Sequence, residues 1–219
     1  MDCPELIAYE GDATDDHLLQ MTTGCPRLTH LTVRDPVADW ALEYFLEHRG
    51  YQLQTLSLSV CGDFRAQAHV IATHCPVLHT LRLSMRAGFT KQELKTIVAG
   101  CGGSLRTLAV LFADLTDGSL EIISAGCPHL VQLELGTCTD VTREGVCIVA
   151  SRCMQLEQIA IYCCDAMDDE TVMTLATQCL HLRSLHHIVT RVTSEGAQRA
   201  VQYRIDHELP SLRVINNVR

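Results

Sequence analysis

Twelve cysteines in a chain of 219 residues are the side chains with the widest range of possible chemistry. Five of them, Cys75, Cys101, Cys127, Cys153 and Cys179, follow one another at steps of 26 residues. A cysteine can ligate a metal, form a disulfide, act as a nucleophile or fill a core. Each role needs different partners at a characteristic spacing, so the neighbours of the cysteines discriminate between the roles.

The spacing of the cysteines and histidines disfavours a metal site. No C-x-x-C pair occurs, and Cys163 and Cys164 are adjacent, so in a strand they point to opposite faces. The same alternation separates His186 from His187, and no cysteine or acidic residue stands at a ligand offset from that pair. We therefore expect no metal and no other cofactor.

Catalytic motifs are also missing from the sequence. Nucleophilic catalysis needs a nucleophile and a base that converge, and no G-x-S-x-G motif is present. Gly102 and Gly103 lack the Lys-Ser or Lys-Thr pair that completes a phosphate-binding loop. We expect these glycines to end a helix in a conformation with positive φ. The sequence thus predicts no catalytic residue and a protein that is not an enzyme.

The cysteine spacing belongs to a repeat that runs through the chain. Cys25 and Gly50 hold the same place in earlier copies, and Cys3 opens a shortened first copy. A leucine pattern follows each of them, as in L-V-Q-L-E-L from Leu130 and L-E-Q-I-A-I from Leu156. Seven or eight copies with a period of about 26 residues indicate a solenoid.

Each copy divides into a strand and a helix. Apolar residues alternate in L-E-L, 133–135, which is the periodicity of a strand. From Thr142 they recur at helical spacing, and Thr142 and Asp168 are the residue types that cap helix N-termini. A longer helix is expected over about 194–207. Stacked units then bury a continuous core between a parallel sheet and a layer of helices.

The repeat resembles the cysteine-containing subclass of the leucine-rich repeat family. Its motif, C-P-x-L-x-x-L-x-L-x-x-C-x-x-[VI]-T-D before a helix, is matched by Cys127, Pro128, Leu130, Leu133, Leu135, Cys138, Val141 and Thr142. The resemblance implies an α/β horseshoe of seven to eight strand-turn-helix repeats, with a parallel sheet on its concave face and a single domain over 1–219. The chain departs from the motif at three places: Gly50 replaces the first cysteine, one residue is missing after Val110, and His187 replaces a strand leucine. We expect local irregularities there.

Packing is the favoured role for most of the cysteines. The first cysteine of each unit precedes the strand, and the second, at Cys61, Cys138 and Cys164, follows it. In a solenoid both stack in rows inside the core, where a free thiol is a small apolar filler. Cys163 is the exception, because its register turns it outward. A metal or a functional thiol stays an open alternative.

Residues between the strand leucines should face outward on the concave side. The middle column is expected to run Thr32, Ser57, Arg82, Ala109, Glu134, Ala160, His186 and Asn216. An apolar stripe is expected along one edge, formed by Val60, Met85, Leu111, Phe112, Tyr162, Ile188 and Val189. Alternatively, the stripe turns under the following loops as satellite core.

An exposed apolar stripe usually marks an interaction site. The residues expected to bind a protein partner on the concave face or at the strand edge are Arg34, Val60, Arg82, Met85, Leu111, Phe112, Glu134, Tyr162, Cys163, His186 and Ile188.

Composition excludes several other functions. The formal net charge of −9 and the absence of a basic run argue against nucleic-acid binding. No window of about 18 apolar residues predicts a membrane span. The N-terminal segment resembles neither a secretory signal nor a transit peptide, so we expect a cytoplasmic or nuclear protein with free thiols.

The resemblance implies a binding function. Proteins with this repeat are often F-box substrate receptors of SCF (cullin-RING) ubiquitin ligases, while mitotic-exit antagonists carry the repeats with little else. Repeats begin at Cys3, so no F-box is expected in this chain. The expected function is a non-catalytic protein-interaction solenoid that recognises a ubiquitination substrate. The alternative is a structural or scaffold subunit of a larger assembly.

Overall fold

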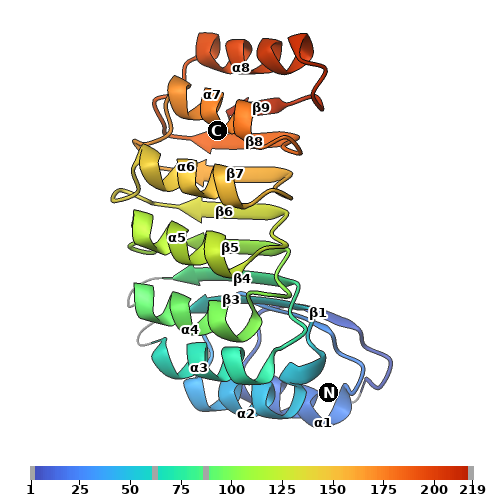
Figure 1. Ribbon diagram of the computed structural model, residues 1–219. Coiled ribbons are helices and arrows are strands. Elements are labelled where there is room, and N and C mark those ends of the chain that lie inside the picture. The colour runs from blue at the N-terminus through green and yellow to red at the C-terminus, as the bar shows by residue number, and fades with distance from the viewer. Residues whose placement is uncertain (1–2, 61–63, 86–88, 217–219) are drawn as a thin grey trace.

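The computed structural model describes residues 3–60, 64–85 and 89–216. In it, strands and helices alternate along the chain (Figure 1). The strands are β1 Ala8–Gly11, β2 His30–Val33, β3 Thr55–Val60, β4 Thr80–Met85, β5 Thr107–Leu111, β6 Gln132–Gly136, β7 Gln158–Tyr162, β8 Ser184–Ile188 and β9 Arg213–Asn216. The helices are α1 Asp15–Gly24, α2 Asp39–Arg49, α3 Arg65–His74, α4 Lys91–Cys101, α5 Asp117–Gly126, α6 Arg143–Arg152, α7 Asp169–Gln178 and α8 Ser194–Asp206.

The strands form one parallel sheet in the order in which they occur in the chain, from β1 to β9. The helices stack in the same order on one side of this sheet, from α1 at the bottom of Figure 1 to α8 at the top. Helices contact the helices of adjacent repeats, and strands contact adjacent strands. This is the solenoid that the repeat predicts: an α/β architecture in which each unit packs on its neighbours.

A single apolar core lies between the sheet and the helices. It contains a row of cysteines that precede the strands and are at most 1% exposed. This interior row consists of Cys25, Cys75, Cys101, Cys127, Cys153 and Cys179. Cys138 and Cys164, which follow their strands, are equally buried, while Cys61 lies outside the described residues.

Gly50 takes the cysteine position in the second repeat because the site is too narrow for a larger residue. A Cβ atom there would lie 2.9 Å from the carbonyl oxygen of His74 and 3.0 Å from Sγ of Cys75. The short 3-10 turn Gly50–Gln52 replaces the usual connection at this point. The expected local irregularity is therefore present.

The helix N-termini follow from capping residues. Thr142 and Asp168 are the N-caps of α6 and α7, as expected, and accept hydrogen bonds from the backbone N–H groups of Glu144 and Thr171. Gly102 follows α4, but its φ is −55°, so the expected positive φ is wrong. A Cβ atom on Gly102 would lie 2.5 Å from the carbonyl oxygen of Gly126, so close packing requires the glycine there.

A polar clamp joins neighbouring repeats at the helix N-termini. The carboxylate of Asp117 accepts hydrogen bonds from the backbone N–H and the hydroxyl of Thr142, at 2.8 and 2.6 Å. Asp169 holds Thr193 of the last helical repeat in the same way, at 2.7 Å for both bonds. These bonds lower the pKa of Asp169. Each such aspartate thereby fixes the N-cap of the next repeat.

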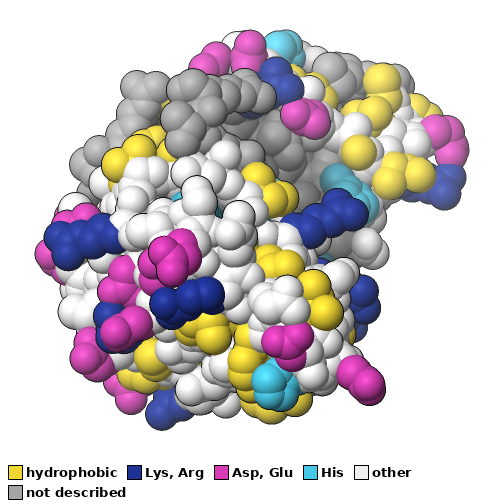
Figure 2. Space-filling view, turned by 90° about the horizontal axis from the view of Figure 1, so that it is seen from above, with side chains coloured by type: hydrophobic (Ala, Val, Ile, Leu, Met, Phe, Trp, Pro, Cys, Tyr) yellow, Lys and Arg dark blue, Asp and Glu magenta, His cyan; other side chains and the backbone are white. Residues whose placement is uncertain are grey.

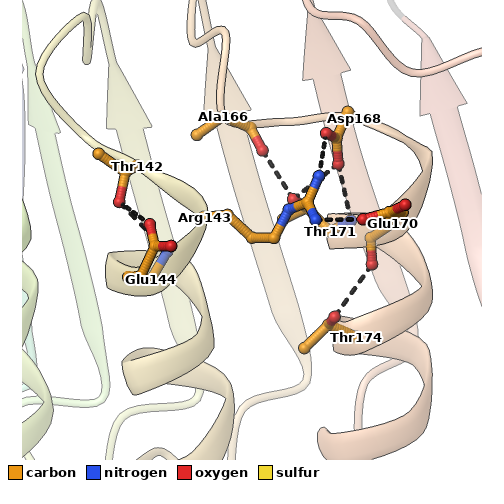
Figure 3. A network of polar contacts seen from close by, with 8 residues as sticks. All are labelled: Thr142, Arg143, Glu144, Ala166, Asp168, Glu170, Thr171 and Thr174. Atoms are coloured by element: carbon orange, nitrogen blue, oxygen red, sulfur yellow. Dashed lines mark hydrogen bonds and ion pairs between the residues drawn. The ribbon is translucent and has the colours of Figure 1, made fainter.

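Between α6 and α7 an arginine takes over this role (Figure 3). Nη2 of Arg143 lies 2.6 Å from the carboxylate of Asp168, and Nη1 pairs with Glu170. Asp168 also accepts hydrogen bonds from the backbone N–H and hydroxyl of Thr171, at 2.9 Å each. Burial alone would raise the pKa of Asp168, but these hydrogen bonds outweigh it and lower the pKa. The N-cap residue of α7 is thus held by an ion pair to the preceding helix, α6.

The last helix closes the core through a buried arginine that sequence reasoning missed. The guanidinium of Arg204 donates hydrogen bonds of 2.8–3.0 Å to the carbonyl oxygens of Ala176, Cys179, Leu180 and Pro210. The bonds to Ala176, Cys179 and Leu180 satisfy carbonyls at and just after the C-terminus of α7, and the bond to Pro210 holds the segment before β9. Burial lowers the pKa of Arg204.

Candidate functional site: the open face of the sheet

The face of the sheet that the helices leave uncovered is the expected concave side, and its register confirms most of the expected columns. Thr32, Ser57, Arg82, Ala109, Glu134, Ala160 and His186 are paired across adjacent strands. At the end of the column the expectation is wrong, because His186 pairs with Ile215 and not with Asn216. The segment between α8 and β9 is one residue shorter than the leucine pattern suggests.

A polar trio occupies the middle of this face. Nη1 of Arg82 on β4 lies 2.9 Å from the carboxylate of Glu134 on β6. Ala109, on the strand between them, is too small to block the contact and is 2% exposed. Burial raises the pKa of Tyr162, and its side-chain hydrogen bond with Glu134 raises it further. The expected site residues Arg82, Glu134 and Tyr162 are therefore held together.

A hollow of about 190 Å³ lies on the N-terminal part of the open face. Arg34 and Arg82 line it, and small hydroxyl side chains between them include Ser57, Ser59 and Ser84. In the described part of the chain these three hydroxyls make no side-chain hydrogen bond, so they can donate to a ligand. Arg34 is exposed and pairs with Glu10 at 2.7 Å, a hydrogen bond that raises the pKa of Arg34.

The strand ends carry a row of exposed residues in an unusual conformation. This strand-end row, which follows β5 to β8, consists of Phe112, Thr137, Cys163 and Val189. Their φ angles are 60°, 59°, 51° and 52°, in the left-handed region that disfavours bulky and β-branched side chains. Phe112 and Val189 are 63% and 71% exposed. These two residues are therefore not satellite core.

The other expected site residues have mixed environments. Leu111, His186 and Ile188 are half-buried on the same face, and Cys163 is exposed as expected. The side chains of Val60 and Met85 lie outside the described residues. Arg34 follows β2 and Ile188 lies on β8, six strand spacings or roughly 29 Å away, so they do not form one compact site. The face is an extended surface rather than a cleft.

The cysteine thiols divide into a buried set and a set that is partly or fully exposed. None of the eleven cysteines that the structure describes forms a disulfide. Burial raises the pKa of Cys75, Cys101, Cys127 and Cys179 to about 12. Such thiols stay protonated and unreactive at neutral pH. Within the described ranges, no three His, Cys, Asp or Glu side chains group into a possible metal site.

His187 occupies the interior position that a leucine holds in other repeats. It is 4% exposed, and its Nδ1 lies 2.9 Å from Oγ1 of Thr190. Burial lowers the pKa of His187, and the nearby His186 lowers it further. The neutral imidazole is thus a satisfied core residue.

Seen from above, acidic and basic side chains are interspersed, with hydrophobic side chains exposed between them (Figure 2). Of the helices described, none is long and apolar enough to cross a membrane.

Fold and surface together define an α/β solenoid of the leucine-rich repeat type, a class that is typically non-catalytic. The chain is similar to Rad7 in the structure of the Rad7–Elc1 complex of yeast, with a TM-score of 0.68, 17% sequence identity and coverage of 96% of this chain. It spans 62% of the Rad7 chain. An internalin from Listeria monocytogenes is a weaker match, with a TM-score of 0.45, 14% identity and coverage of 80% of this chain and 65% of the internalin.

No protein-family model matches the sequence. No curated protein matches it either.

Proposed function

We propose that this protein is a non-catalytic interaction solenoid that binds a protein partner through the open face of its sheet and the strand-end row. The observation that carries the proposal is the exposure of Phe112 and Val189 beside the polar trio of Arg82, Glu134 and Tyr162. Exposed apolar groups next to oriented polar groups are the usual composition of a protein interface.

Within this function we propose substrate recognition for a cullin-RING ubiquitin ligase. The cysteine-containing repeat resembles that of F-box substrate receptors, and the similar repeat protein Rad7 was solved in complex with a partner, Elc1. Free thiols favour a reducing compartment, the cytoplasm or the nucleus. The whole of 1–219 acts as one recognition domain in this proposal.

A second candidate function is a structural subunit of a larger assembly. A hollow of about 550 Å³ between α8 and β9 has a mixed lining of apolar and polar side chains: Ala197, Val201, Val214, Glu195, Gln198, Arg199 and Gln202. A hollow with apolar and polar groups side by side at the last described repeat would suit a neighbouring subunit. A protein that is stable only together with a stoichiometric partner would favour this function.

Affinity purification followed by mass spectrometry tests the first proposal. The variant Phe112→Asp/Val189→Asp should lose the partner, because both side chains are exposed and aspartate tolerates a left-handed backbone. The control Met154→Asp/Leu180→Asp changes two exposed apolar residues that precede strands and should keep the partner. Equal capture by both variants would refute the proposed surface. Capture of the partner without any cullin or RING subunit would refute the ligase assignment alone.

A further inference from the structure

An aromatic stripe lies on the outer face of α2, apart from the open face of the sheet. Trp40, Tyr44 and Tyr51 are 55%, 40% and 57% exposed. Trp40 and Tyr44 are four residues apart and therefore lie on one side of α2, and Tyr51 lies on the 3-10 turn that follows the helix. The ring of His48 joins the stripe, since its centroid lies 4.2 Å from that of Tyr44.

The stripe is not part of the core. The opposite side of α2 supplies the buried residues Ala41, Leu42, Phe45 and Leu46. The helices cover the other side of the sheet from the open face (Figure 1). A ligand on the outer face of α2 would therefore leave the proposed partner site free.

Acidic residues flank the aromatic rings. Asp39, Glu43 and Glu47 follow one another at steps of four along the same helix. No ion pair to any of these three carboxylates occurs among the residues that the structure describes. The nearby Arg49 is directed toward α1, where its Nε donates to the backbone carbonyl oxygen of Thr22 at 2.6 Å. The surface thus combines exposed aromatic faces with carboxylates that lack a cationic partner.

We propose that this face of α2 binds a lysine- and arginine-rich segment of a second protein. The faces of Trp and Tyr rings attract ammonium and guanidinium groups, and adjacent carboxylates add charge-assisted hydrogen bonds. The stripe from Trp40 to Tyr51 is about 16 Å long at the rise of an α-helix. An extended segment of about five residues spans that length.

The fluorescence of Trp40 can be used to measure peptide binding to the stripe. Trp40 is the sole tryptophan of the chain, so its fluorescence reports on this surface. The probe is the synthetic peptide acetyl-RGKRGKRG-amide, and its control has glutamine at every Arg and Lys. We expect a saturable change in Trp40 fluorescence with the basic peptide, weakened by added salt, and none with the glutamine peptide. An equal response to both peptides, or none to either, overturns the proposal.

Two variants locate the binding site. Glu43→Gln/Glu47→Gln and Tyr44→Ala/Tyr51→Ala should each weaken the affinity about tenfold while the melting transition stays cooperative. Glu121→Gln/Glu208→Gln changes the net charge of the protein by the same amount, away from α2, and should bind as the unmodified protein does. If this control loses as much affinity as Glu43→Gln/Glu47→Gln, the attraction is only that of an acidic protein for a basic peptide.

Discussion

Cys163 and Cys164 are neighbours in sequence and opposites in structure. Cys164 is 1% exposed and burial raises its pKa, whereas Cys163 is exposed with a φ of 51°. The difference extends to whole rows: the interior row is buried and consists of cysteines, and the strand-end row is exposed and varied in residue type. In a repeat of this kind the position within the unit, more than the type of residue, therefore decides what a side chain can do.

The largest expected contrast between interior and strand end concerns packing. Leu133→Ala removes a fully buried side chain from β6 and should lower the free energy of unfolding by about 2–5 kcal/mol. Phe112→Ala removes a larger side chain that is 63% exposed and should change it by less than about 0.5 kcal/mol. Urea unfolding followed by circular dichroism measures both. A comparable loss in Phe112→Ala would show that the strand-end row is part of the core.

The pH dependence of stability tests whether the side chain of His187 is buried in the interior. Because burial lowers its pKa, the unfolded chain binds more protons, so stability is complete above the unfolded pKa of about 6.5 and is lost as pH falls through the folded pKa. His187→Leu restores the leucine of the repeat and should add about 1 kcal/mol at pH 7.5. Its advantage over the unmodified protein should grow towards pH 5 in urea unfolding. If the stability difference between His187→Leu and the unmodified protein did not vary with pH, the imidazole of His187 would be exposed to solvent in the folded protein.

The smallest expected effect concerns the strand-end backbone. Thr137→Asn should stabilise the protein by about 0.5 kcal/mol, since asparagine tolerates the left-handed conformation better than a β-branched residue does. The control Thr107→Asn, in strand β5, should destabilise by up to about 1 kcal/mol. Thermal unfolding measures the two signs. A loss of stability in Thr137→Asn would mean that the threonine makes a compensating contact.

Much of the fold could be predicted from the sequence. The period locates the strands and helices, Thr142 and Asp168 are recognisable as N-caps, and α8 ends within one residue of the predicted end. These features depend on local pattern and on a repeat whose copies correct one another. Cys163 is exposed as predicted, but strand alternation does not account for it: Tyr162 before it faces outward, and the left-handed backbone at Cys163 turns its side chain outward as well.

Other features depend on contacts that a pattern does not contain. The left-handed turn at Phe112 and Val189 is not indicated by residue type, since neither is a glycine or an asparagine. Arg204 would be assigned to a solvent-exposed face, yet carbonyls from two separate segments surround it. The contact of Arg82 with Glu134 depends on the small size of Ala109 on the intervening strand. Each case needs the spatial neighbour before the residue can be interpreted.

The clamp between consecutive repeats has a consequence for how such a chain can change in length. Asp117 and Asp169 hold only the unit that follows them, and apart from the ion pair of Arg82 with Glu134 across β5 the main contacts of each strand and helix are with its adjacent counterparts. Duplication of one internal coil would therefore create junctions of a kind already present, without disturbing distant ones. A gene for this architecture can gain sheet surface one unit at a time.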